Sequence, residues 1–128
     1  MRILIADDET DLRKLIALTL KRRGFDVLEA ESGDVALKTA ISEQPHLVIL
    51  DVMMPVQTGI EVARALAINP ATSSIPVIFV SAKGQVADIA DGLKTGAKAY
   101  LVKPFETKDL LDLIEKTIPE PNMRKRNA

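Results

Sequence analysis

Five short apolar runs, separated by segments of helical periodicity, constrain the fold of this chain more than any other feature of its sequence. The expected strands are residues 3–6, 27–30, 47–50, 77–80 and 99–102. Strands that alternate with helices form a parallel sheet with right-handed crossovers, and nearly continuous apolar strands indicate a sheet covered on both faces. The pattern therefore predicts a (βα)₅ domain of the α/β class.

The segments between the expected strands carry apolar residues at helical spacing. This spacing is seen in Leu12, Leu15, Ile16 and Leu20, in Val86, Ile89, Ala90 and Leu93, and in Leu110, Leu113, Ile114 and Thr117. Gly24 and Gly96 stand where helices should stop, and Ser32 fits a helix N-cap. Pro45 and Pro76 stand just before expected strands. These signals place the expected element boundaries.

The chain has 128 residues, of which 47% are hydrophobic, and this is enough for one domain with an ordinary core. We expect that domain to cover residues 1–118 and a basic tail or linker to cover residues 119–128. The sequence leaves open whether the protein acts alone or is a fragment of a longer one.

Charge and composition exclude several classes of protein. The 17 Lys and Arg residues nearly balance the 18 Asp and Glu residues, which gives no reason to expect direct DNA binding. The absence of cysteine rules out disulfides and thiolate metal sites. Neither a signal peptide nor a membrane-spanning run is evident, so we expect a soluble, cytoplasmic protein without a membrane partner.

Reactive side chains follow four of the five expected strands. Asp7, Asp8 and Glu9 follow the first strand, Asp51 the third, Ser81 the fourth and Lys103 the fifth. In an open parallel sheet the carboxyl ends of the strands form the edge at which ligands bind. We therefore expect these side chains to lie close together.

Carboxylates gathered at one edge repel each other unless a cation shares the site. Mg²⁺ suits such a site because it prefers oxygen ligands and keeps several waters, whereas no histidine cluster or thiolate is present to favour zinc. Lys103 could neutralise a phosphoryl group, and the Ser81 hydroxyl could donate a hydrogen bond to it. Asp51 stands apart from Asp7 and Asp8, which makes it the best candidate for a nucleophile in phosphoryl transfer.

The same residues carry a resemblance to a known family. They are Asp7-Asp8, the run from Asp51 through Val52, Met53 and Met54 to Pro55 with Gly59 following, Ser81-Ala82, and Lys103-Pro104-Phe105. Together they resemble the receiver domain of bacterial two-component response regulators, from residue 2 to about residue 118. The chain resembles the stand-alone, chemotaxis type of regulator.

The resemblance implies a flavodoxin-like three-layer fold with strand order 2-1-3-4-5. It implies that Asp51 accepts a phosphoryl group from the phosphohistidine of a sensor histidine kinase or phosphotransfer protein. Asp8 and Asp51 should then ligate Mg²⁺ directly, Asp7 through water, and Met53 through its backbone carbonyl. Ser81 and Lys103 should hold the phosphoryl oxygens, and the Lys103-Pro104 bond should be cis.

The resemblance also implies a switch. Phosphorylation of Asp51 should draw Ser81 inward and turn Tyr100 from exposed to buried, which would remodel the surface of the fourth helix, fifth strand and fifth helix. That surface should then bind a downstream protein target or a second copy of the chain. Met53 and Lys83 offer no group to position an attacking water, so we expect slow self-dephosphorylation and no other enzymatic activity.

Each residue also has a simpler interpretation. Asp7 and Asp8 could only cap a helix, Asp51 could be a turn residue, and Ser81 could merely bond to nearby backbone. Tyr100 would by default be a half-buried strand residue, and His46 is read as structural or surface. Only the joint placement of these side chains at one sheet edge favours a site.

Three other functions are weighed against the switch. An aspartate-based phosphohydrolase would need an Asp-x-Asp motif on the first strand, which this chain lacks. A flavin electron carrier would need a loop rich in Ser, Thr or Gly there, but Asp7, Asp8 and Glu9 would repel the cofactor phosphate. A docking module without phosphoryl chemistry is disfavoured because every expected site residue is present. The kinase, the stimulus and the output cannot be read from the sequence.

Overall fold

The protein forms one five-stranded parallel sheet in a computed structural model that describes residues 1–82, 94 and 96–117. The strands are β1 (Arg2–Ala6), β2 (Asp26–Ala30), β3 (Leu47–Asp51), β4 (Val77–Ala82) and β5 (Ala99–Lys103). They lie in the order β2-β1-β3-β4-β5, and every neighbouring pair is parallel. The predicted α/β fold and strand order are confirmed.

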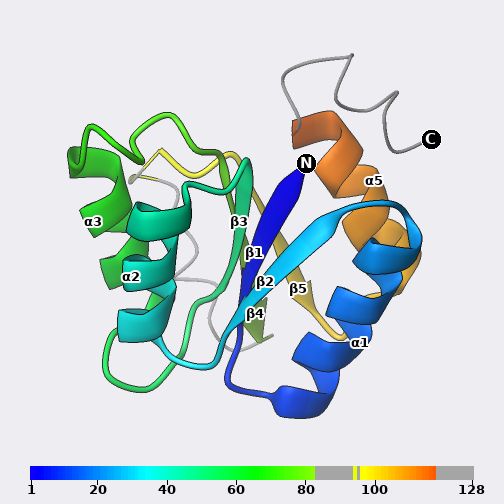
Figure 1. The fold of residues 1–128 in the computed structure, drawn as a ribbon. Helices are drawn as coiled ribbons and strands as arrows, with labels where there is room; N and C mark the ends of the chain where they lie inside the picture. Colours follow the sequence, from blue (N-terminus) through cyan, green and yellow to red (C-terminus); the bar gives the residue numbers. More distant parts are fainter. Residues whose placement is uncertain (83–93, 95, 118–128) are drawn as a thin grey trace.

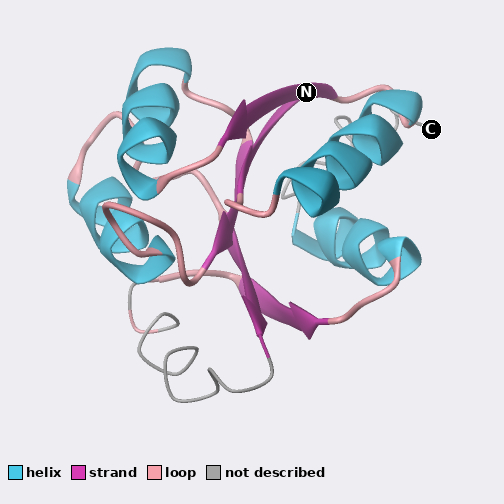
Figure 2. Cartoon of the chain, turned by 90° about the horizontal axis from the view of Figure 1, so that it is seen from below, coloured by secondary structure: helices cyan, strands magenta, loops and turns pink. Residues whose placement is uncertain are grey.

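Helices cover both faces of the sheet, which gives three layers (Figure 1, Figure 2). The described helices are α1 (Thr10–Arg22), α2 (Gly33–Glu43), α3 (Gly59–Ile68) and α5 (Thr107–Thr117). Helices α2 and α3 lie on one face, and α1 and α5 lie on the other. The expected helical stretch from Val86 to Leu93 lies outside the described residues. No helix of the described ranges is both long and apolar enough to cross a membrane.

Alternating residues of the strands pack into two separate hydrophobic cores, one on each face of the sheet. On β1, Leu4 packs into the core beneath α2 and α3, whereas Ile3 and Ile5 pack into the core beneath α1 and α5. All five residues of β3 are buried, as expected for the centre of a doubly covered sheet. The outer strands β2 and β5 are only partly buried.

The buried face of α1 differs from the predicted one. The expected apolar stripe contained Leu12 and Leu15, but the side chain of Leu15 is 55% exposed and Leu12 is only partly buried. The residues that α1 buries are Arg13, Ile16, Ala17 and Leu20, which follow the spacing i, i+3, i+4, i+7. The face that α1 turns to the sheet therefore includes a charged residue, Arg13.

Element boundaries largely follow the turn residues. Ser32 is the N-cap of α2, but its hydroxyl accepts no hydrogen bond from the backbone N–H groups of the helix and instead donates to the Asp34 carboxylate at 2.6 Å. Gly24 follows α1 with a φ of +92°, a conformation that glycine adopts without strain. His46 lies one residue before β3, and its Nδ1 accepts a hydrogen bond from the Arg2 backbone N–H at 3.0 Å.

The loop after β3 returns closely to its own strand. The Gly59 N–H donates to the Val52 carbonyl at 2.7 Å, and a Cβ atom at position 59 would lie 2.1 Å from the Asp51 carbonyl oxygen. Only glycine fits this approach. A capping box between Thr58 and Glu61 then starts α3. The packing of this loop therefore fixes the backbone of Asp51.

Candidate functional site

Three carboxylates meet at the carboxyl edge of the sheet. Ala6 of β1 pairs with Leu50 of β3, so that Asp7 and Asp51 follow on neighbouring strands. Asp7, Asp8 and Asp51 each offer one carboxylate oxygen, and these oxygens all lie within 4.8 Å of one another. Asp7 and Asp51 are buried, with 3% and 5% of their surface exposed, whereas Asp8 is exposed. The structure thus brings together the three aspartates that the sequence singled out.

Lys103 enters the same cluster from the end of β5. Its Nζ lies 2.8 Å from Glu9 Oε1, 3.1 Å from Asp7 Oδ2 and 3.5 Å from Asp51 Oδ2. The Lys103-Pro104 peptide bond is cis, which agrees with the expectation from the resemblance. A single ammonium group therefore faces three carboxylates.

The electrostatics of the cluster are most visible in Asp51. Burial raises the pKa of its carboxyl, and the charges of Asp7 and Asp8 raise it further. Lys103 and the Met53 backbone N–H oppose this shift, but the pKa still rises to about 7. The charged form of Asp51 is therefore destabilised at neutral pH, and an additional cation in the site would stabilise it.

Lys103 shows the complementary effect. Burial lowers its pKa, but the hydrogen bond to Glu9 and the charges of Asp51 and Asp7 outweigh burial, so that the net pKa is raised. Lys103 also borders a hollow of about 210 Å³ that is lined by Glu9, Leu12, Pro104 and Phe105. The ammonium group therefore stays charged and lies beside open space.

The remaining expected site residues lie near the end of β4, in the loop after β3 and on β5. Ser81 is fully buried near the end of β4, and its hydroxyl donates to the Ala82 carbonyl at 3.1 Å. Met53 is 52% exposed, and its backbone N–H bonds to the Asp51 carboxylate. Tyr100 on β5 is 46% exposed, so the described state has an outward tyrosine. Lys83 lies outside the described residues.

Two residues of the site had no role in the sequence prediction. Glu9 makes the shortest of the Lys103 contacts, although it was noted only as part of an acidic run. Arg13 is buried, and its Nη1 donates to the Asp7 carbonyl at 2.8 Å. A signal for Arg13 was present, because it lies three and four residues before Ile16 and Ala17 on the buried face of α1.

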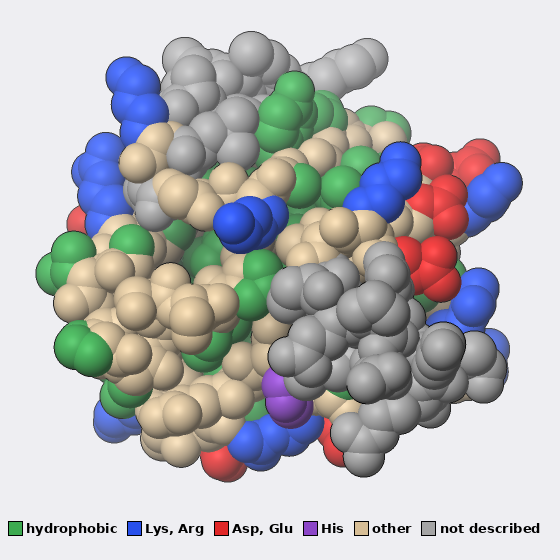
Figure 3. Space-filling view, turned by 90° about the horizontal axis from the view of Figure 1, so that it is seen from above, with side chains coloured by type: hydrophobic (Ala, Val, Ile, Leu, Met, Phe, Trp, Pro, Cys, Tyr) green, Lys and Arg blue, Asp and Glu red, His purple; other side chains and the backbone are tan. Residues whose placement is uncertain are grey.

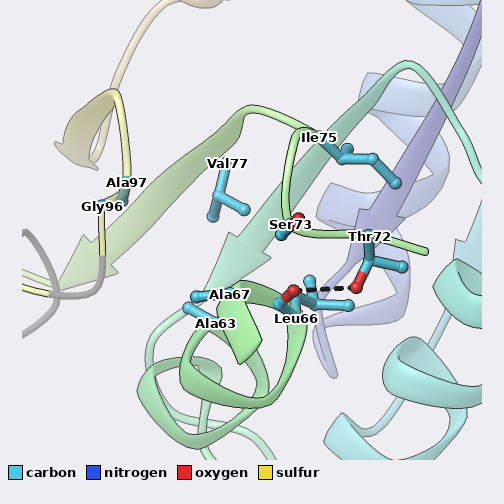
Figure 4. A pocket seen from close by; sticks show the side chains of 9 residues that line it. All are labelled: Ala63, Leu66, Ala67, Thr72, Ser73, Ile75, Val77, Gly96 and Ala97. Carbon is cyan, nitrogen blue, oxygen red and sulfur yellow. Dashed lines mark hydrogen bonds between the residues drawn. The ribbon is translucent and has the colours of Figure 1, made fainter. Parts of the chain in front are cut away.

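A second hollow lies away from this cluster, between α3 and β4 (Figure 4). Its volume is about 30 Å³, which is room for little more than water. Thr72, one of its polar lining residues, uses its hydroxyl to bond to the Leu66 carbonyl at 2.8 Å. The hollow therefore has neither the size nor the charge of the cluster at the carboxyl edge.

The donor set at the carboxyl edge fits Mg²⁺. All of the clustered ligand atoms are carboxylate oxygens, and two of the three carboxylates are buried, where charge is poorly solvated. The raised pKa of Asp51 indicates that Lys103 alone does not compensate the negative charge. The residues present are therefore suited to a hard divalent cation.

Comparison with known proteins identifies the class. The sequence model of the family described as response regulator receiver domain matches residues 3–115 of this chain. Two solved structures have the same fold at 29% identity. The chemotaxis response regulator CheY4 of Vibrio cholerae has a TM-score of 0.85, covering 91% of this chain and 97% of that one. A receiver domain protein of Clostridium thermocellum has a TM-score of 0.84, covering 97% and 96%. This chain belongs to the response regulator receiver family of two-component signalling.

Sequence relatives point to longer proteins. The phosphate regulon transcriptional regulatory protein PhoB of Pseudomonas aeruginosa is 40% identical over 109 residues, which cover 85% of this chain and 48% of PhoB. The DNA-binding response regulator MtrA of Mycolicibacterium paratuberculosis is 37% identical over 110 residues, covering 86% and 48%. This chain spans about half the length of these relatives.

Proposed function

We propose that this receiver accepts a phosphoryl group on Asp51 from the phosphohistidine of a sensor kinase or phosphotransfer protein. The observation that carries this proposal is the state of Asp51: a buried carboxylate with a pKa raised to about 7, with Lys103 Nζ at 3.5 Å. Active sites are where such perturbed groups gather. Membership of the family supports the reaction class, and the geometry supports Asp51 as the acceptor.

Mg²⁺ would be held by Asp7, Asp8 and Asp51, with the Met53 backbone carbonyl as a further ligand. The chemistry that the bound ion supplies is neutralisation of the phosphoryl oxygens as they approach the carboxylates. The close clustering of the three aspartate oxygens supports this assignment. Asp51 would thus serve both as a ligand of the ion and as the acceptor of the phosphoryl group.

In the transfer step an Asp51 oxygen attacks the phosphorus of the donor phosphohistidine. The new P–O bond forms as the P–N bond breaks, and the imidazole leaves with the electron pair and takes a proton from solvent. Lys103 keeps its charge because its pKa is raised, and it pairs with a phosphoryl oxygen. Ser81 donates a hydrogen bond from its hydroxyl to another phosphoryl oxygen.

The protein acts only on its own acyl phosphate, which it hydrolyses slowly.

The phosphoryl group would act as a switch through Ser81 and Tyr100. Reorientation of the Ser81 hydroxyl would make room for Tyr100 to turn inward from its exposed position on β5. The changed surface around β5 and α5 would bind a downstream protein or form a phosphorylation-dependent homodimer. Only a few kcal/mol of differential binding is needed to shift such an equilibrium.

The wider assignments are also proposals. Residues 1–118 form the receiver domain, and residues 119–128 form a tail or linker. The names of PhoB and MtrA assign transcriptional regulation and DNA binding to those longer proteins, whereas we propose that this receiver passes its signal by protein contact. The cytoplasm, where receiver and kinase would meet, is the proposed location.

Intact-mass measurement with acetyl phosphate tests the proposed function. We expect the wild-type protein to gain one phosphoryl mass in Mg²⁺, when quenched in acid, and to gain none in EDTA. The Asp51→Asn variant removes the nucleophilic oxygen and should gain none in either condition. Asp26→Asn is the matched control because Asp26 is exposed at the opposite edge of the sheet, and it should be phosphorylated like the wild type.

Two outcomes contradict the proposal. Absence of any mass gain in the wild-type protein would favour a docking module without phosphoryl chemistry. Phosphorylation of Asp51→Asn to the wild-type level would place the acceptor on another residue.

A further inference from the structure

Arg13 is the one cation among the buried charged side chains of the described residues. It is 6% exposed, and the other two are Asp7 and Asp51, both members of the carboxylate cluster. Removing a guanidinium from water costs several kcal/mol unless its contacts compensate. The contacts of Arg13 therefore indicate what this residue does.

The guanidinium of Arg13 joins three elements of the fold. Its Nε lies 3.0 Å from Glu29 Oε1 on β2, and its Nη1 donates to the Asp7 carbonyl at 2.8 Å. The Asp7 N–H in turn donates to the Ala30 carbonyl at 3.1 Å. Both polar backbone groups of Asp7 are therefore held, one by β2 directly and the other by β2 through Arg13.

Holding the Asp7 carbonyl also holds Asp8. The carbonyl of residue 7 and the N and Cα atoms of residue 8 lie in one rigid peptide plane. Rotation of that plane would swing the exposed Asp8 carboxylate away from Asp7 and Asp51. The single hydrogen bond from Arg13 therefore acts on the direction of a carboxylate that it does not touch.

An ion pair alone does not account for Arg13. Lys14 already pairs with Glu29 from the surface, with Nζ 3.4 Å from Oε1 and a side chain that is 63% exposed. Apolar residues of similar volume often replace a buried ion pair without loss of stability. The contact that distinguishes Arg13 from Lys14 is the hydrogen bond to the Asp7 carbonyl.

We propose that Arg13 is a positioning residue of the carboxylate site, which fixes the peptide between Asp7 and Asp8 and thereby sets the affinity of the site for Mg²⁺. The inference rests on the proposed function, since it assumes that these carboxylates bind the ion. Residues that orient metal ligands from behind typically change metal affinity by about 10- to 100-fold when they are substituted.

The test is calorimetric titration of the folded protein with Mg²⁺ alone, without a phosphoryl donor. We expect Arg13→Met to weaken Mg²⁺ binding at least about tenfold. Lys14→Met is the matched control, because it removes a cation beside the same Glu29 without touching Asp7, and it should change the Kd less than about twofold. Chemical unfolding of each variant measures stability separately.

The outcomes separate this inference from the proposed function. If Arg13→Met lowers stability but binds Mg²⁺ with the wild-type Kd, the role of Arg13 is structural and the inference is wrong. If the Met variant does not fold, Arg13→Lys decides, because its single ammonium cannot hold Glu29 and the Asp7 carbonyl as the planar guanidinium does. An unchanged Kd in Arg13→Lys would then overturn the inference. If the wild type binds no Mg²⁺, the proposed metal site itself fails, and the inference fails with it.

Discussion

At the carboxyl edge of the sheet charged side chains are buried and crowded, whereas at the amino edge they are exposed and paired. Asp7 and Asp51 lie buried at the carboxyl edge, and the exposed Asp8 clusters with them. At the amino edge, Arg2 Nη1 lies 3.5 Å from Glu43 Oε2, and these side chains are 37% and 47% exposed. In the view onto the amino edge the single histidine is visible at the surface beside Lys and Arg side chains (Figure 3).

The two edges also differ in how their charged side chains affect the free energy of unfolding. Exposed pairs such as Arg2 and Glu43 contribute about 1 kcal/mol or less, because water solvates each charge nearly as well as its partner does. The buried carboxylates repel one another, and the cost appears as the raised pKa of Asp51. A cluster of like charges that lowers stability is expected of a functional site. Among the described residues, the amino edge has no such cluster.

The largest difference in stability between the two edges should appear when one glycine at each edge is replaced by alanine. Gly59→Ala at the carboxyl edge would place a Cβ atom 2.1 Å from the Asp51 carbonyl oxygen, so the loop must move. We expect about 3 kcal/mol of destabilisation by urea unfolding, together with weaker Mg²⁺ binding. Gly96→Ala, before β5 at the amino edge, meets open space and should lose only about 1 kcal/mol from its φ of +96°. Equal losses would contradict the described packing.

The next effect is a pH dependence of stability that arises from Asp51 at the carboxyl edge. The pKa of Asp51 is about 7 in the folded protein and 3.8 ordinarily, so between these values the folded state binds more protons than the unfolded state. Stability of the wild type without Mg²⁺ should therefore fall as pH rises from about 4 to about 7. Asp51→Asn should remove this slope and be more stable at pH 8 by about 2 kcal/mol, a value that allows for solvent screening.

Urea unfolding at several pH values in EDTA measures this effect. Glu43→Gln, which neutralises a carboxylate at the amino edge, is the control and should keep the wild-type slope. A slope that survives in Asp51→Asn would assign the titration to another group.

A smaller effect is expected for His46→Ala. The substitution removes the Nδ1 that accepts the Arg2 backbone N–H, and water can replace it because His46 is exposed. We expect a loss of less than about 1 kcal/mol and unchanged phosphorylation by acetyl phosphate. Loss of phosphorylation would show that the two edges are coupled.

The smallest effect is expected for Glu43→Gln itself. Its ion pair with Arg2 is exposed, so the free energy of unfolding should fall by about 0.5 kcal/mol or less, and by less still at high salt. A loss above about 1 kcal/mol would mean that the amino edge also depends on its charges.

Much of the fold was predictable because its signals are local. The strands are short apolar runs, and turn residues such as Gly24 and Ser32 mark the starts and ends of helices. The cluster of Asp7, Asp8 and Asp51 was predictable because parallel strands must bring their carboxyl ends to one edge. Only topology and strand length are needed for that inference.

The rest depends on packing, which one sequence does not display. Leu15 was expected in the buried stripe of α1, but Arg13 and Ala17 are buried and Leu15 is exposed. The contact between Glu9 and Lys103 joins residues 94 positions apart and depends on how β5 ends. The roles of Ser81 and Tyr100 in a switch concern a second conformation and stay predictions.

The most direct test of this account is carbon-13 NMR titration of the Asp51 carboxyl, assigned by comparison with Asp51→Asn, with and without Mg²⁺. Without Mg²⁺ the account predicts a pKa of about 7, and with saturating Mg²⁺ a pKa shifted clearly downward, because the cation relieves the repulsion from Asp7 and Asp8. An ordinary aspartate pKa in both conditions would contradict it, since the carboxyl edge would then be no more strained than the amino edge.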